Sequence, residues 1–356
     1  MTAVLADKIK TSVRISYALR RIPQERLACL LPCSEPMQPG DLALARLEKI
    51  GKNTRLELAN GRLCTLHEGD LLAVVFGNRY ATQQFEGYAQ ADGECCDLLS
   101  MGGVCGLVKS KHASVAEPSK LRLLGALGDA DRRPLRLRDF TLPPTSAPKP
   151  PHVLVVCGTS MDAGKTYTAM SLIIGLQRQG YSAAGIKLTG TATGRDTWSM
   201  LDAGACIALD FVDGGFPSTY LATLEELLEL YSRLLAYAAA QGATWVVVEI
   251  ADGLLQRETA ALLQTSCFTA TVSAWVFAAS DPLAAVGGLQ VLRGWGIEPL
   301  ALSGLVSMSP LSLWEAQAAT GLTCLTAREL QDGELNARLP AAVRASFYPS
   351  ATEVHA

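Results

Sequence analysis

The chain has 356 residues, of which 49% are hydrophobic and 18% charged, a composition that excludes global disorder and supplies enough apolar material for sizeable cores. The net charge of −3 gives no electrostatic drive toward nucleic acid or an anionic membrane. No apolar run approaches the roughly 20 residues of a membrane span, and the N-terminus lacks the apolar stretch of a signal peptide, so we expect a cytoplasmic protein.

The N-terminal part of the chain shows short alternating runs separated by turn signals. Residues 55–66 alternate around Asn60-Gly61, which favours a two-residue hairpin turn. Apolar runs at 40–51 and 69–78 flank this hairpin, and together they predict a β-meander. We therefore expect a small, mostly-β, barrel-like domain over residues 1–142.

Some residues of this part stand out from plain turns. Arg79 and Tyr80 are candidates for contact with a ligand or another domain, and the glycine-rich stretch 101–106 is unusual. The ten cysteines of the whole chain are scattered without a C-x-x-C pair, and its four histidines are dispersed. We expect reduced, mostly buried thiols and no zinc site.

A proline-rich segment marks the change to a second pattern. Five prolines fall within residues 139–151, which predicts a semi-rigid linker over 143–151. From there to residue 356, apolar strand-like runs alternate with helical periods, which indicates an α/β domain with a parallel sheet covered on both faces. The expected strands are 152–157, 182–188, 244–252, 272–280 and 299–308, and the expected helices are 165–179, 223–242 and 283–296.

The first strand of this domain runs into a loop that is typical of phosphate binding. The usual pattern, G-x4-G-K-[ST], would need a glycine at Thr159, but the nearest glycine is Gly158. The loop still follows a buried strand and opens a helix, so backbone amides would hold phosphates there; the alternative is a plain glycine-rich turn. The expected nucleotide-binding residues are Gly158, Thr159, Ser160, Met161, Asp162, Ala163, Gly164, Lys165, Thr166 and Tyr167.

Charged residues elsewhere complete the predicted site. Lys165 would reach the β- and γ-phosphates and Thr166 would bind Mg²⁺. Glu249 ends the third strand, where a side chain points into the ligand crevice of a parallel sheet, so we expect it at the metal or at an attacking water. The alternative for Glu249 is a surface acid at the end of a strand.

Two further charges lie beyond the second strand. Asp196 is a candidate metal ligand, with a helix N-cap as the alternative. Lys187 would stabilise a transferred phosphoryl group or an anionic substrate, with a surface lysine as the alternative. The catalytic candidates are thus Lys165, Lys187 and Glu249. Residues 252–259 are either a substrate or switch loop or a helix N-terminus.

The shifted loop resembles a known class. "GTSMDAGKT" has the G-T-x4-G-K-T frame of dethiobiotin synthetase, and related loops occur in the molybdopterin-guanine dinucleotide accessory GTPases and cobyrinic acid diamide synthases, all SIMIBI-class P-loop proteins. The segments "GIKLTGTATG", "GRDTWSMLDAGA" and "WVVVEIADG" follow in the matching order, over residues 152–330. The chain departs from dethiobiotin synthetase at Ala251-Asp252-Gly253, which replaces a glycine pair, and lacks its adenine-reading asparagine.

The resemblance implies an enzyme that uses Mg²⁺ and ATP, with GTP as the alternative nucleotide. It favours a ligase-like or kinase-like step on a small metabolite, with a small-molecule substrate and neither nucleic acid nor membrane as partner. The alternative is a nucleotide-switch accessory protein in cofactor biosynthesis, whose β domain binds the client. A plain regulatory nucleotide-binding module and a homodimer both stay open.

Overall fold

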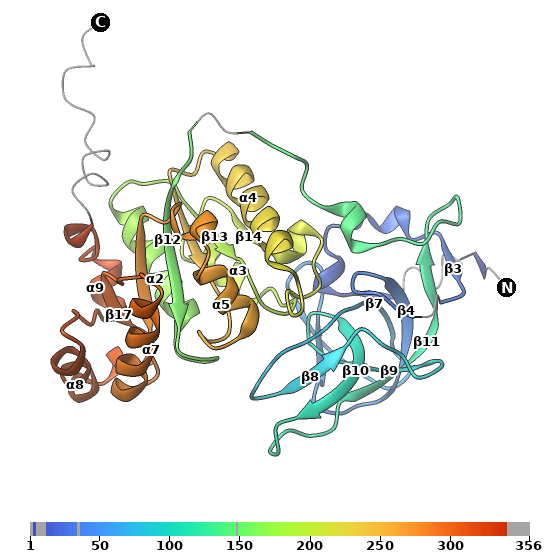
Figure 1. Ribbon diagram of the computed structural model, residues 1–356. Helices are drawn as coiled ribbons and strands as arrows, with labels where there is room; N and C mark the ends of the chain where they lie inside the picture. The colour runs from blue at the N-terminus through green and yellow to red at the C-terminus, as the bar shows by residue number, and fades with distance from the viewer. Residues whose placement is uncertain (1–2, 5–11, 34–35, 147–148, 340–356) are drawn as a thin grey trace, which may run out of the picture. The chain divides into compact units, whose positions relative to one another are not determined.

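The computed structural model describes residues 3–4, 12–33, 36–146 and 149–339 (Figure 1). The expected linker and both expected domains extend into residues outside these ranges, which include 147–148 and 340–356. The chain divides into two compact units, and each is built from three segments. The first unit comprises Met1–Pro143, Thr189–Trp198 and Asp210–Thr223, and the second comprises Pro144–Leu188, Ser199–Leu209 and Leu224–Ala356.

The first unit is mostly β, as the sequence predicts. Its short 3-10 helices are η1 (Tyr17–Leu19), η2 (Gln24–Arg26), η3 (Leu137–Phe140) and η4 (Phe211–Gly214). Its strands are β1 (Ala3–Val4), β2 (Arg14–Ile15), β3 (Cys29–Leu31), β4 (Leu42–Lys49), β5 (Arg55–Glu57), β6 (Leu63–Thr65), β7 (Leu71–Phe76), β8 (Phe85–Tyr88), β9 (Cys95–Leu98), β10 (Val104–Lys111) and β11 (Ser119–Gly128).

Strand pairing in the first unit closes into a barrel. The ring runs from β11 to β4, β7, β10 and β9, and β9 pairs back with β11. Of these pairs only β7 with β10 is parallel. The interior is filled by alternate apolar residues, such as Ala43, Ala45 and Leu47 on β4. Closure leaves the ring without an exposed strand edge, which confirms the barrel-like expectation.

The predicted meander is wrong in its pairing. The hairpin of β5 and β6 forms around Asn60-Gly61, but these strands pair only with each other among the described residues. The strands on either side of it, β4 and β7, pair directly. The reason is that β4 and β7 both present buried faces to the barrel core, whereas alternation in β6 leaves Leu63 and Thr65 exposed.

The second unit is the α/β domain that the sequence predicts. Its six-stranded sheet has the order β14-β13-β15-β12-β16-β17, and β12 pairs in parallel with both β15 and β16. The strands are β12 (His152–Gly158), β13 (Ala183–Lys187), β14 (Ala208–Asp210, whose last residue belongs to the first unit), β15 (Trp245–Glu249), β16 (Ala274–Ala278) and β17 (Ala301–Ser303). The helices are α2 (Lys165–Arg178), α3 (Arg195–Asp202, which begins in the first unit), α4 (Leu224–Ala240), α5 (Arg257–Leu263), α6 (Ser266–Thr269), α7 (Pro282–Gly294), α8 (Pro310–Thr320) and α9 (Ala327–Gln331), followed by the 3-10 helix η6 (Asn336–Arg338).

Helix α2 packs its apolar side on the sheet, with Ala169, Leu172 and Ile173 against Val156 and Val247. The expected strand 299–308 is shorter than predicted, because Gly304 has φ +91° and residues Leu305–Met308 form the 3-10 helix η5 instead. The described part of the chain contains no helix that is long and apolar enough to cross a bilayer.

Candidate functional site

The phosphate-loop sequence forms a tight turn between β12 and α2. Gly164, at φ +93°, directly precedes the first residue of α2, Lys165. Asp162 also has a positive φ, +61°, and its side chain is exposed. A short polar residue is one of the few non-glycine types that tolerates this backbone conformation, which accounts for a carboxylate inside the loop. The 14-residue helix α2 therefore points its N-terminal amides at the loop.

The position of Gly158 explains the shifted glycine spacing. A Cβ on Gly158 would lie 2.8 Å from Cγ of Lys165 and 2.9 Å from the carbonyl oxygen of Ala278. The aliphatic part of the Lys165 side chain thus lies close to the end of β12, and so does the paired strand β16. The glycine is therefore needed at the strand end, where these two neighbours pass, one residue earlier than in the common loop.

Two other glycines allow the backbone to pack closely against the loop, and the sequence analysis did not identify them. A Cβ on Gly253 would lie 2.3 Å from the carbonyl oxygen of Thr159, and a Cβ on Gly304 would lie 2.3 Å from that of Ala163. The Leu305 amide also donates to the Ala163 oxygen at 3.1 Å. Both glycines follow strand ends of the sheet, which is the only signal in the sequence that could have pointed to them.

Lys165 is the central cation of the loop. Its side chain is 6% exposed, and Nζ donates to the carbonyl oxygen of Ser160 at 2.7 Å. Burial lowers the pKa of Lys165, and the nearby ammonium group of Lys187 lowers this pKa further. Two cations thus come close to one loop, an arrangement that suits a polyanionic ligand. The Thr159 hydroxyl is buried in the same loop and has no hydrogen-bond partner among the described residues.

Glu249 brings three side chains of the site together. Its Oε1 atom accepts a hydrogen bond from Thr166 Oγ1 at 3.0 Å and lies 2.5 Å from Lys187 Nζ. The Glu249 side chain is 1% exposed and that of Lys187 is 12% exposed. The contact follows from the sheet order, because β15 lies between β13 and β12 and aligns Lys187 with Glu249 in register.

The oxygen groups at this point suit magnesium. A hydroxyl and a carboxylate are hard ligands, and Mg²⁺ usually takes one or two such protein groups together with phosphate and water. Thr166 and Glu249 would supply them. No group of three or more His, Cys, Asp or Glu side chains gathers as a metal centre in the described part of the chain.

The remaining predicted residues lie in different places. Asp196 is the second residue of α3, so it is not the N-cap of that helix. Asp196 belongs to the first unit, whereas Thr166 and Glu249 belong to the second. The stretch 252–259 contains a helix N-terminus: Gln256 caps α5 and accepts from the Thr259 amide at 2.8 Å.

Arg79 and Tyr80 lie within the first unit. Arg79 is 8% exposed and donates to Gln84 Oε1 at 2.7 Å, and the Tyr80 ring lies 5.5 Å from that of Tyr220. In the glycine-rich stretch, a Cβ on Gly102 would lie 2.0 Å from the carbonyl oxygen of Ala192. That glycine is therefore required by close packing against residues 189–198.

Gly304→Ala is expected to deform the phosphate loop. The new methyl group would meet the Ala163 oxygen, at a residue whose φ already disfavours a side chain. We expect a loss of unfolding free energy of about 2–4 kcal/mol, from the backbone conformation and overpacking combined. Gly296→Ala is a control for a positive φ without a close neighbour, since Gly296 has φ +78° with nothing within 4 Å of its Cβ position, and it should lose less. Equal losses in urea unfolding would contradict the close approach.

Comparison with known proteins adds little to this geometry. No family model matches the chain, and no curated protein matches it. Many solved structures resemble part of it, and two of them are described here. The signal recognition particle 54 kDa protein from Aeropyrum pernix K1, in complex with GDP, shares 20% identity over 55% of this chain, with a TM-score of 0.36.

The signal recognition particle receptor FtsY from Elizabethkingia anophelis shares 13% identity over 54% of this chain and 68% of its own, with a TM-score of 0.34. The chain spans 49% of the length of the first of these structures. At such low TM-scores neither structure carries an argument about this chain. The site is therefore defined by its own geometry: the parallel sheet, the loop between β12 and α2, and the side chains around Glu249.

Proposed function

We propose that the chain is a Mg²⁺-dependent nucleoside triphosphatase of the SIMIBI class, and that its nucleotide state acts as a switch on its own β unit. Support for nucleotide binding comes from the tight loop on the N-terminus of α2, with Lys165 buried beside it. Thr166 and Glu249, which both belong to the second unit, would hold Mg²⁺. The nucleotide is ATP or GTP.

One observation carries the switch. Lys187 ends β13 and pairs with Glu249, and two residues later the chain enters the first unit at Thr189. The amide of the intervening Leu188 donates to the Glu249 carbonyl oxygen at 2.9 Å. If binding of Mg²⁺ changes the contacts of Glu249, the change would therefore shift the start of residues 189–198, because only Leu188 separates Lys187 from Thr189.

The first unit holds that segment by a buried carboxylate. Glu57 is 3% exposed and accepts from the Gly194 amide at 2.8 Å, from Trp198 Nε1 at 2.8 Å and from Thr193 Oγ1 at 3.1 Å. Such charge-assisted bonds are stronger than bonds between neutral groups, so the segment moves with the barrel.

The other inserted segment, 210–223, is held by a second set of charged groups. Arg20 donates to both Asp210 and Asp213 at 2.7 Å, and the Tyr17 hydroxyl donates to Asp210 at 2.7 Å. Both segments that leave the α/β sheet are thus fixed to the β unit, which suits an accessory protein whose β unit responds to nucleotide and engages the client.

The second candidate is phosphoryl transfer to a small metabolite. It is favoured by Lys187, whose largely buried ammonium group lies at the carboxyl end of the sheet, where it would stabilise an anionic substrate. On this candidate, a small carboxylate or amine would be consumed in proportion to the nucleoside diphosphate formed.

Hydrogen exchange on the full chain separates the two candidates. The switch predicts that Mg²⁺ with a non-hydrolysable ATP or GTP analogue changes amide exchange in 189–198 and 210–223. Lys187→Ala should remove this response and leave slow hydrolysis near wild type, while the exposed control Lys149→Ala should retain it. The switch would be ruled out if the rate of amide exchange in both segments were the same with and without nucleotide. A fall in turnover by about two to three orders of magnitude in Lys187→Ala, roughly 3–4 kcal/mol, would favour the metabolite enzyme.

A further inference from the structure

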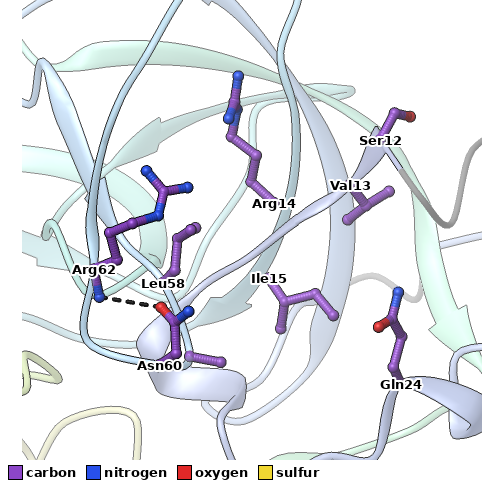
Figure 2. Close-up of a pocket in the computed structure, with 9 residues that line it drawn as sticks. Ser12, Val13, Arg14, Ile15, Gln24, Leu58, Asn60 and Arg62 are labelled. Atoms are coloured by element: carbon purple, nitrogen blue, oxygen red, sulfur yellow. Dashed lines mark hydrogen bonds between the residues drawn. The ribbon is translucent and has the colours of Figure 1, made fainter.

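The first unit contains a cavity that the nucleotide site does not use. It has a volume of about 390 Å³, at the lower end of the size of small-molecule pockets. One wall comes from β2 and its approach, and the opposite wall comes from the turn that joins β5 to β6 (Figure 2).

The two walls of the cavity are joined by backbone hydrogen bonding. The Ala59 amide donates to the Ile15 carbonyl oxygen at 3.0 Å, and Ser16 and Leu58 form a β-bridge beside it. The turn itself is closed by the Leu58 amide, which donates to the Arg62 oxygen at 3.0 Å. The cavity is therefore preformed, and a ligand would not need to order its walls.

The polar lining of the cavity offers donors. Asn60 Oδ1 accepts a hydrogen bond from the Arg62 backbone amide at 3.1 Å (Figure 2). The side-chain oxygen of Asn60 is thus occupied within the turn, and its NH₂ group is the part that can donate to a ligand. The Arg62 side chain bonds no acceptor within the described residues. Arg14 adds a second guanidinium, which Asp70 binds at 2.9 Å and Cys64 Sγ contacts at 2.8 Å.

The charged side chains that line the cavity, Arg14 and Arg62, are both positive. Among the described residues no aspartate or glutamate lines the cavity, and the nearby Asp70 pairs with Arg14. The guanidinium of Arg62 is therefore the group that we expect to meet a ligand. Val13, Ile15 and Leu58 add half-buried apolar surface. A ligand that matches this lining has an acceptor-rich anionic group and a short apolar body.

We propose that this cavity binds a small organic anion, a carboxylate or phosphate ester carried on a short apolar chain. The guanidinium of Arg62 and the amide NH₂ of Asn60 receive the anionic group. Val13, Ile15 and Leu58 receive the apolar part. The assignment is independent of the nucleotide site, because each of its residues belongs to the first unit.

A tryptophan next to the cavity reports on its occupation. Gly61, at the tip of the turn, has φ +83°, and a Cβ there would lie 2.8 Å from Cε2 of Trp198. The Trp198 indole is held in place because Nε1 donates to Glu57. A ligand that contacts Asn60 and Arg62 therefore alters the surroundings of this ring, and its fluorescence should respond.

The test titrates four probes with the same six-carbon chain into the full, nucleotide-free protein by calorimetry: hexanoate, hexyl phosphate, hexanol and hexylamine. We expect one or both anions to bind, and the alcohol and the amine to bind at least about tenfold more weakly. Arg62→Gln should weaken anion binding about tenfold, because a charged hydrogen bond is lost. Arg328→Gln, at a side chain that is 92% exposed in the second unit, should change nothing.

Fluorescence locates the binding event. The anion should change tryptophan emission in the wild-type chain, and Trp198→Phe should lose that change while calorimetric binding persists. A preference for hexyl phosphate identifies a phosphate ester as the ligand class, and a preference for hexanoate identifies a carboxylate. Absence of anion binding, equal binding of hexanol and hexanoate, or binding that Arg62→Gln leaves intact would each overturn the assignment.

Discussion

Lys165→Ala is expected to weaken the binding of ATP and GTP strongly in the presence of Mg²⁺ while the chain stays folded. The ammonium group of Lys165 is buried at the start of α2, and its loss would remove a charge-assisted contact with the phosphates. We expect a cost of about 2–3 kcal/mol, roughly 30- to 150-fold in Kd, measured by calorimetric titration.

The same variant separates a binding role from a structural one. Burial already lowers the pKa of Lys165, which means that the folded protein disfavours its charged form. Removing the ammonium group should therefore leave the melting temperature of the nucleotide-free protein near wild type. Lys149→Ala removes an exposed lysine of the same unit and should alter neither property. Wild-type nucleotide affinity in Lys165→Ala would refute the phosphate-loop proposal.

Breaking the contact between Lys187 and Glu249 from either side is expected to destabilise the second unit strongly. Each partner is largely buried, so Glu249→Gln leaves a buried cation and Lys187→Met leaves a buried anion. Loss of one partner of a buried ion pair costs about 3–5 kcal/mol. The double variant should recover part of this loss, because neither member of the pair then stays behind as a buried charge.

A double-mutant cycle in urea unfolding measures this coupling. The matched control is the pair of Arg293 and Glu298, which has an Nη2–Oε1 distance of 2.8 Å but side chains that are 46% and 58% exposed. Exposed pairs contribute only about 0–1 kcal/mol, so Glu298→Gln with Arg293→Met should show little coupling. Equal coupling in the two cycles would mean that Glu249 and Lys187 are not held as a buried pair.

Glu249→Gln also tests whether Glu249 takes part in Mg²⁺-dependent hydrolysis of the nucleotide. Thr166 loses its carboxylate partner in Glu249→Gln, while the Lys165 side chain and the loop amides are retained. We expect Mg²⁺-dependent hydrolysis to fall much further than nucleotide affinity. A parallel loss of both would place Glu249 in the support of the loop rather than at the metal.

Local sequence predicted most strands and three of the helices of the second unit, but not β14 or the short helices α3, α5, α6, α8 and α9. The buried runs of β12, β13, β15 and β16 and the helical period of α2 are short-range patterns, and the order of Gly164, Lys165 and Thr166 at the start of a helix is a local feature. The twofold alternation and the Asn60-Gly61 turn likewise predicted strands and a hairpin in the first unit.

Only the tertiary structure decided which of these groups meet. Lys187 lies 62 residues and Thr166 lies 83 residues from Glu249, and they converge because β15 pairs with both β13 and β12. The barrel closes through β9, and 189–198 joins the first unit through Glu57, 137 residues from Gly194. Strand order and long-range closure depend on how buried faces pack across the chain. Periodicity records which face of an element is buried, but it does not record which partner covers that face.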